Sequence, residues 1–462
     1  MEFWLFAPFR FPLNIYSERF AANPAAFANL MAPLAGRLPE TLRPFLVMPH
    51  GETGEDSGPR FETMEQHGSG LRSLQLFQLR SSAPGDLVDQ NLIRGAQQAD
   101  DLLAKELRGR MTPVAGDWRI VVCDNSVAEL WLKVTVSEPD PALLARFDRW
   151  SNSLVEVALK GILQSVLYPI LDALHQLGES DQTALVRSRE DFEAIFDLRE
   201  NLDNSDKTRF RASYSPLLWV GRVCLLAQEA PGWHEPLCHW APALNWNDGI
   251  EDAEGAKIYL AWGNSVVIKG AGDTAPSGLV DAFLRAQYYF AAMDVLNRNL
   301  MQLYAFLGDS GERPRQRWLQ RLNARVGRSV VAVDLLAMEY SDTRQEVQGR
   351  ERRYLEKLLT AWGLDELLGA TRRKLTLARE RLERLNRMRS LVGQRRVELL
   401  LIFVGSVALL ELGLTLASLA GPLKESHLLG WLNRVSQDWV LGVSMILVAS
   451  ICLVAGGWVR RR

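Results

Sequence analysis

Two long apolar runs close to the carboxyl end constrain this chain more than any other feature. Leu399–Ala420 holds 22 residues with Glu411 as its one charge, and Trp439–Val459 holds 21 residues with no charge. A helix rises about 1.5 Å per residue, so each run can cross the roughly 30 Å apolar core of a bilayer. We therefore predict a transmembrane helical hairpin over residues 397–462, with a short outer loop at 421–438.

The flanking charges orient this predicted hairpin. Arg395 and Arg396 precede the first run, and Arg460, Arg461 and Arg462 follow the second. Basic residues accumulate on the cytoplasmic side of membrane proteins. The loop between the runs carries two basic and two acidic residues and so has no basic excess. The predicted location is the bacterial inner membrane, with two spans and with both termini in the cytoplasm.

A polar stripe interrupts the first apolar run. Thr415 and Ser418 follow Glu411 at i+4 and i+7, which places the three on one helix face. A carboxylate at mid-membrane costs about 2.5–3.5 kcal/mol even on the most permissive scale, so Glu411 should face protein or water. One interpretation is an ion pathway lined by the stripe; the other is hydrogen bonding between helices. Two helices cannot enclose a pathway, so the first interpretation requires a cyclic homo-oligomer.

Residues 276–396 are predicted to form a helical layer and a stalk. Thr371 to Arg396 contains no proline, and apolar residues recur there at spacings of three and four, which suits packing on other helices. The same stretch holds ten basic residues against two acidic ones, a balance that favours binding to anionic lipid head groups. Nucleic acid is not the expected partner, because the basic residues surround the helix and no aromatic set accompanies them. The apolar residues are Leu375, Ala378, Leu382, Leu385 and Val392, and the basic ones are Arg372, Arg373, Lys374, Arg379, Arg381, Arg384, Arg387, Arg389, Arg395 and Arg396.

Residues 1–275 are predicted to form a cytoplasmic α+β domain. Short runs rich in Val, Ile, Leu and Trp are typical of strands, and Pro141–Leu177 has the apolar spacing of one long helix, which Pro169 should kink. The whole chain is 47% hydrophobic and 23% charged, as in ordinary globular proteins, so its apolar signal is concentrated in the hairpin. The predicted strands are 3–6, 45–48, 74–79, 118–123, 130–136, 218–227, 257–262 and 265–269.

Catalytic motifs are missing from the sequence. It has no glycine-rich phosphate loop with a following Lys-Ser/Thr, no His-Glu-x-x-His and no nucleophile elbow, so we do not predict an enzyme. His234, Cys238 and His239, with Cys224 nearby, are metal-ligand types, but their spacing matches no standard zinc site. Ordinary packing is the favoured interpretation, and no metal site or ligand-binding residue is assigned.

The order of these elements resembles that of the CorA-type metal-ion transporters. An α+β domain, a helical layer, one long helix entering the first span, a short loop, a second span and a basic tail follow one another in both. The resemblance implies a homopentamer whose first span lines the pore, with a divalent cation as the ion. The Gly-Met-Asn signature of that family should follow the first span, where this chain reads Leu419-Ala-Gly-Pro-Leu-Lys424. This departure argues against a standard magnesium transporter.

With these departures, the chain resembles one divergent branch of the CorA-type family. CorA-like proteins associated with type III CRISPR systems are membrane effectors in antiviral defence, opened by a nucleotide second messenger of the adenylylated S-adenosylmethionine type. Three functions stay open at this point: a gated channel or transporter for cations, a nucleotide-opened effector, and a non-conducting membrane scaffold. The expected partners are other copies of the chain and membrane lipids, with a nucleotide ligand added under the second hypothesis.

Overall fold

The computed structural model describes residues 1–11, 13, 33–40, 42, 46–47, 75–81, 85–123, 127–180, 216–227, 232–270, 275–309, 316–420, 442, 446 and 450. The chain divides into two compact units. The first, here called the sheet unit, comprises Met1–Gly308 and Ala324–Ala378. The second comprises Asp309–Asn323 and Arg379–Arg462. The boundary expected near residue 275 therefore falls inside the sheet unit.

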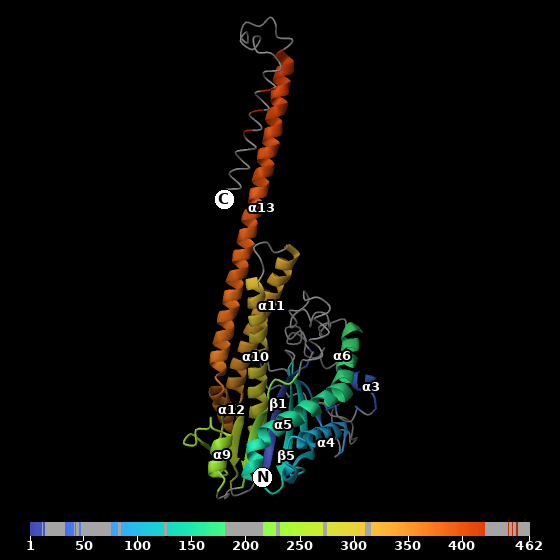
Figure 1. Cartoon of the computed structure of the whole chain (residues 1–462), viewed down its shortest axis with the longest axis vertical. Coiled ribbons are helices and arrows are strands. Elements are labelled where there is room, and N and C mark those ends of the chain that lie inside the picture. The colour runs from blue at the N-terminus through green and yellow to red at the C-terminus, as the bar shows by residue number, and fades with distance from the viewer. Residues whose placement is uncertain are drawn as a thin grey trace. The chain divides into compact units, whose positions relative to one another are not determined.

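A mixed sheet forms the centre of the sheet unit (Figure 1). Among the described residues it has nine strands in the order β2-β3-β4-β5-β1-β6-β9-β8-β7. Neighbouring strands are antiparallel, except that β6 and β9 are parallel. An α+β fold was predicted and is confirmed. The strands are β1 (Glu2–Arg10), β2 (Leu46–Val47), β3 (Gln75–Arg80), β4 (Met111–Cys123), β5 (Val127–Val136), β6 (Gly221–Leu226), β7 (Ile250–Glu251), β8 (Lys257–Tyr259) and β9 (Asn264–Ile268).

Strand β1 lies in the middle of this sheet and is longer than the predicted 3–6. It pairs with β5 along its whole length and with β6 over Glu2–Phe6. Side chains alternate between the two faces of a strand, so Phe3 and Leu5 enter one core while Trp4 and Phe6 enter the other; all four are buried. The apolar composition of β1 follows from this two-sided burial.

One helical layer packs on the face of Phe3 and Leu5. The rings of Phe3 and Phe147 stack with centroids 3.9 Å apart. The long helix predicted here is present, but a π-helical turn, Leu163–Leu167, stands just before Pro169. Such a turn accommodates one extra residue within a helix, and it occurs where the sequence predicts a kink. This layer contains α3 (Leu34–Arg37), α4 (Leu87–Asp100), α5 (Pro141–Ile162), α6 (Tyr168–Ser180) and α9 (His234–Trp240), with a 3₁₀ turn at Lys105–Leu107.

A second helical layer packs on the opposite face. Phe283 stacks on Phe6 with ring centroids 4.7 Å apart, and the indole of Trp362 donates to the Ala261 carbonyl at 3.1 Å. The layer consists of α10 (Leu279–Asp309), α11 (Gln316–Glu346), α12 (Gly349–Ala361) and the beginning of α13 (Leu364–Ala420), of which α10, α11 and α13 continue into the second unit. The predicted apolar positions of α13 are buried at Leu375, Ala378, Leu382 and Leu385.

The close contact between α4 and α5 depends on Gly95, which has no side chain. A Cβ atom added at Gly95 would lie 2.6 Å from the backbone carbonyl oxygen of Leu154. We expect Gly95→Ala to destabilise the protein by about 1–3 kcal/mol, because the helices must move apart. Thermal unfolding of the purified full-length chain in detergent measures this. Gly36→Ala is the control, since nothing lies within 4 Å of its added Cβ; equal unfolding temperatures for the two variants would refute the packing argument.

Candidate functional site

The apolar stretch of α13 is exposed along almost its entire described length. Between Val397 and Leu409 the large apolar side chains other than the half-buried Leu399 are 38% (Ile402) to 65% (Leu401) exposed. Ser406 is buried, and its hydroxyl donates to the Ile402 carbonyl at 2.7 Å. Exposed apolar surface on this scale marks contact with a membrane or with other chains.

The stretch Pro141–Leu174 provides the opposite case. Among the described residues it is the one helix stretch that is long and apolar enough to cross a membrane, yet 56% of its apolar 18-residue window is buried inside the protein. It comprises α5, the π turn and the first part of α6, and it supplies core residues such as Phe147 and Leu154. Hydropathy alone would therefore select a core helix. The apolar stretch of α13, Val397–Leu409, is shorter but has no comparable cover.

The predicted polar stripe lies on α13 beyond this stretch. Glu411 and Thr415 are both exposed, one turn apart. The Thr415 hydroxyl donates to the Glu411 backbone carbonyl at 2.8 Å. Ser418 is in the same helix, but its side chain is outside the described residues. The same holds for the side chains of Arg395 and Arg396, and for the outer loop, Arg460–Arg462 and nearly all of the second run.

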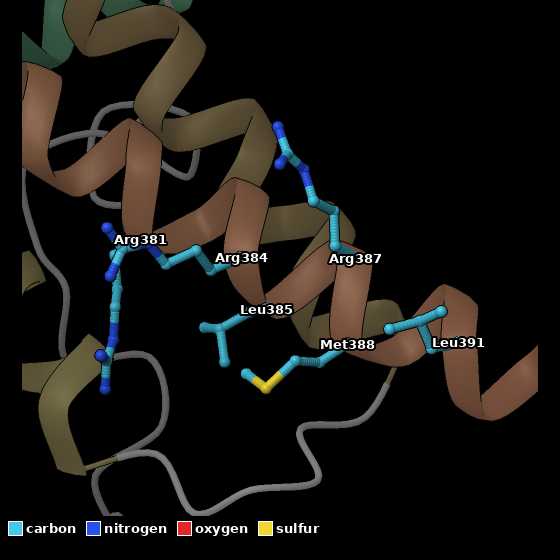
Figure 2. A pocket seen from close by; sticks show the side chains of 6 residues that line it. All are labelled: Arg381, Arg384, Leu385, Arg387, Met388 and Leu391. Atoms are coloured by element: carbon cyan, nitrogen blue, oxygen red, sulfur yellow. The ribbon is translucent and has the colours of Figure 1, made fainter.

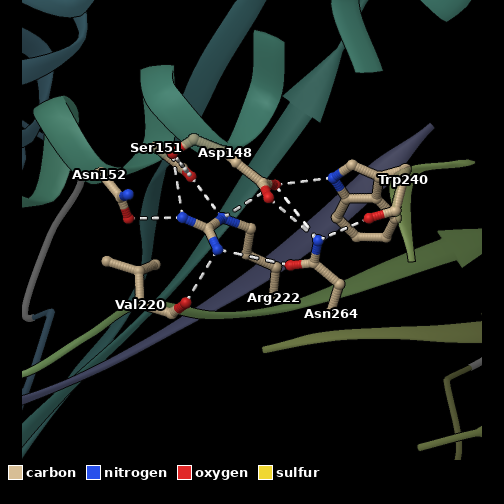
Figure 3. A network of polar contacts seen from close by, with 7 residues as sticks. All are labelled: Asp148, Ser151, Asn152, Val220, Arg222, Trp240 and Asn264. Carbon is tan, nitrogen blue, oxygen red and sulfur yellow. Dashed lines mark hydrogen bonds and ion pairs between the residues drawn. The ribbon is translucent and has the colours of Figure 1, made fainter. Parts of the chain in front are cut away.

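A buried arginine is the hub of a second candidate site, inside the sheet unit (Figure 3). Arg222 of β6 is 6% exposed. Its Nε donates to the Ser151 hydroxyl at 2.7 Å, and its two Nη atoms donate to the backbone carbonyls of Val220 and Asp148, both at 3.0 Å. Nη2 also donates to the side-chain oxygen of Asn152. Every guanidinium nitrogen therefore has a partner within the protein.

Asp148 connects this arginine to the next strand. Its carboxylate accepts from the Trp240 indole at 2.7 Å and from the Asn264 amide at 3.1 Å, and it lies 3.4 Å from Arg222 Nε. Burial lowers the pKa of Arg222, and the nearby Asp148 charge opposes that shift. Because its donors are already engaged, Arg222 offers little to an anionic ligand. The network instead joins α5 and α9 to the parallel pair β6–β9.

We expect Arg222→Met to lower the free energy of unfolding by about 3–5 kcal/mol, since removing one partner leaves buried acceptors unpaired. Urea unfolding of the full-length protein in detergent measures the loss. Arg119→Met is the matched control, because the Arg119–Asp281 pair (2.9 Å) is more exposed and should contribute about 1 kcal/mol or less. Similar losses in free energy of unfolding in both variants would show that the Arg222 network stabilises the fold no more than a partly exposed ion pair does.

Other buried polar groups have no partner in the part of the chain that the structure describes. Both carboxylate oxygens of Glu129, both amide atoms of Gln287 and the indole nitrogen of Trp131 lack hydrogen bonds there. Glu129 and Trp131 share the face of β5 opposite Leu130, and Gln287 contacts the neighbouring part of the sheet at Gly221. Burial raises the pKa of Glu129 well above its ordinary value. The side chain is thereby biased towards its uncharged form.

The raised pKa of Glu129 makes stability depend on pH. A carboxyl with a higher pKa in the folded state stabilises the fold fully below its unfolded pKa, and loses that contribution as pH rises through the folded pKa. Glu129→Gln does not titrate, so its stability relative to wild type should increase between pH 5 and pH 8, by up to about 1.4 kcal/mol per pH unit. Thermal unfolding across this range is the measurement. Glu106→Gln, at an exposed carboxyl, is the control; a difference independent of pH for Glu129→Gln would contradict the assignment.

The ligand-type residues around α9 do not converge. The Cys238 sulfur lies 3.6 Å from His234 Nδ1, one turn away on the same helix, while His239 Nδ1 lies 2.9 Å from the Glu235 carbonyl. Cys224 is fully buried in β6, and burial raises the pKa of its thiol. Within the described ranges, no group of three or more His, Cys, Asp or Glu side chains is placed to hold a metal ion.

Comparisons with known proteins add no relative. No protein-family model matches the chain, and neither the curated proteins nor the solved structures contain a match. The function is therefore inferred from the chain's own residues, above all from the exposed apolar part of α13.

Proposed function

We propose that this chain is a membrane protein of CorA-like architecture that assembles around an axis and conducts cations, with the sheet unit controlling the pathway. The observation that carries the proposal is the exposure of the apolar side chains between Val397 and Leu409. In water, that surface would be a severe aggregation hazard, whereas lipid and neighbouring helices would cover it. Helix α13 continues to Ala420, long enough for a span of about 36 Å from Val397.

The position of Glu411 supports a pathway. An exposed carboxylate on an otherwise apolar helix is costly against lipid, so it should face water or another subunit. Thr415 adds a hydroxyl one turn further on. Rings of carboxylates from several copies of a helix favour cations. A homopentamer, as the resemblance implies, would place five such carboxylates around the axis.

Helix α13 supplies the means of control. Its first turns belong to the sheet unit, where Leu364 and Thr371 are buried, and the same uninterrupted helix carries Glu411. A change in packing of those first turns can therefore act on the helix that would line the pathway. A ligand would open or close it only by binding the two states with different affinity.

We expect Glu411→Gln to reduce cation-over-anion preference in proteoliposomes about tenfold or more, because the ring of negative charge is lost. Flux of monovalent and divalent cations, with chloride for comparison, is the readout. Glu398→Gln is the matched control, since Glu398 is an exposed carboxylate on the same helix just before the apolar run. Unchanged flux and preference in Glu411→Gln would remove the pathway assignment. Absence of flux from well-formed oligomers would favour the scaffold hypothesis.

The nucleotide-opened effector is a narrower form of the same proposal. Among the described residues of the sheet unit, none singles out a nucleotide, so this hypothesis is tested by a ligand screen on the same proteoliposomes. Opening by an adenylylated S-adenosylmethionine, together with a rise in unfolding temperature, would favour the defence role.

A further inference from the structure

Helix α11 has an exposed face that is both apolar and acidic. Val331 is 56% and Met338 49% exposed, and beside them lie the exposed Asp334 and the half-buried Asp342. At 3.6 residues per turn, these four side chains lie within about 80° of the helix circumference. Residues 331–342 include no lysine or arginine, so no basic residue of this stretch offsets the two aspartates. This face is here called the acidic stripe.

The acidic stripe lies opposite the face through which α11 packs within its own chain. Leu336, Tyr340 and Thr343, on the other side of the helix, are buried. The Thr343 hydroxyl lies 2.6 Å from the Tyr289 hydroxyl of α10. The Tyr340 hydroxyl donates to the Asp365 carboxylate of α13 at 3.0 Å. These contacts hold α11 in the sheet unit and leave the acidic stripe uncovered.

Helix α13 has an exposed face of the opposite charge. Ahead of its apolar stretch, the exposed large apolar side chains among the described residues are Leu377, Met388 and Leu391, at 49–55% exposure. Arg381 and Arg384 lie between them, and the five residues follow one another at alternating spacings of four and three. This spacing keeps them on one side of the helix, as in the seam of a coiled coil. This face is here called the basic stripe.

The basic stripe contains a pocket of about 420 Å³ (Figure 2). Leu385 is buried, and Figure 2 shows Leu385 and Met388 on the opposite side of the helix from Arg387. When helices pack, a hollow between side chains of one helix receives a side chain of the other. A flexible apolar side chain such as Met338 is suited to an irregular hollow of this kind. The pocket is lined by Arg381, Arg384, Leu385, Arg387, Met388 and Leu391.

The two stripes match in length and are complementary in charge. The acidic stripe extends over about 17 Å of helix and the basic stripe over about 21 Å. Each combines apolar side chains with two like charges, and none of these four charged groups forms an ion pair with another described residue. Two copies of the same stripe would bring like charges together, which is unfavourable across an interface. The acidic stripe of one copy and the basic stripe of another would bring opposite charges together.

We propose that the acidic stripe of one copy of this chain binds the basic stripe of a neighbouring copy. The contact joins two different surfaces, so repeating it around an axis closes a ring of subunits. It removes exposed apolar side chains from water, and the opposite charges set the register of the two helices. The inference rests on the proposed assembly around an axis and deepens it by naming the surfaces that join the copies.

Charge reversal in the full-length protein in detergent tests this contact. Asp334→Arg with Asp342→Arg reverses the acidic stripe, and Arg381→Glu with Arg384→Glu reverses the basic stripe. Each double variant should raise the protein concentration at which half of the subunits are assembled about tenfold or more, because like charges then meet. Combining all four substitutions should bring that concentration back close to the wild-type value. Analytical ultracentrifugation over a range of protein concentrations measures it.

The matched control is Arg372→Glu with Arg379→Glu, because both arginines are exposed on the opposite side of α13. This variant reverses two charges and should assemble like wild type; a loss equal to that of the stripe variants would show a general charge effect and overturn the contact. Assembly that is insensitive to both stripe reversals would also overturn it. So would a fourfold variant that assembles no better than the double variants.

These outcomes can be told apart from those of the flux experiment. Assembly that depends on the two stripes in a protein without cation flux would leave the contact standing and remove the channel. Cation flux through oligomers that ignore every stripe reversal would remove the contact and leave the channel. A wild-type chain that is monomeric at every concentration would overturn both the contact and the proposed assembly.

Discussion

The sheet unit depends on one strand that is buried on both faces and hydrogen-bonded along both edges. Strand β1 pairs with β5 and β6, so breaking it would divide the sheet in the middle. Phe3 reaches Phe147 in one helical layer and Phe6 reaches Phe283 in the other. The two helical layers thus lie on opposite faces of the sheet, and each packs against side chains of β1. Glu2, the first residue of β1, forms ion pairs with Lys133 and Lys269. Partial burial raises the pKa of the Glu2 carboxyl, but hydrogen bonds from the two lysines outweigh that effect, so the pKa is lowered overall.

The two cores treat buried polar groups differently. On the Phe3 side, Arg222 has every guanidinium nitrogen engaged and Asp148 joins three partners, so burial costs little beyond desolvation. On the Phe6 side, Glu129 and Gln287 are buried without partners in the described part of the chain. A buried polar group without a partner costs free energy. The first turns of α13 lie on this second face.

Two helical stretches within the described residues are strongly apolar, and they differ in what surrounds them. Pro141–Leu174 is apolar because it fills a core, whereas Val397–Leu409 is apolar without any cover of comparable extent. The distinction is thermodynamic: the first has already lost its contact with water on folding, and the second can lose it only against lipid or other subunits.

Local patterns in the sequence determined the position of many strands and helices of this protein. Alternation and apolar runs located most strands, including β1, β3 and β6; helical spacing located α5 and the buried positions Leu375 and Leu382; and the sequence alone pointed to the stripe at Glu411. Only the tertiary structure decided the state of Glu129, because alternation along β5 places it opposite Leu130 and a face can be covered or exposed. It also decided that Arg222, a charge within an apolar strand, is fully hydrogen-bonded by α5, Val220 and Asn264. Burial and pairing depend on residues far apart in the chain, and no local pattern encodes which segments come to cover a given face.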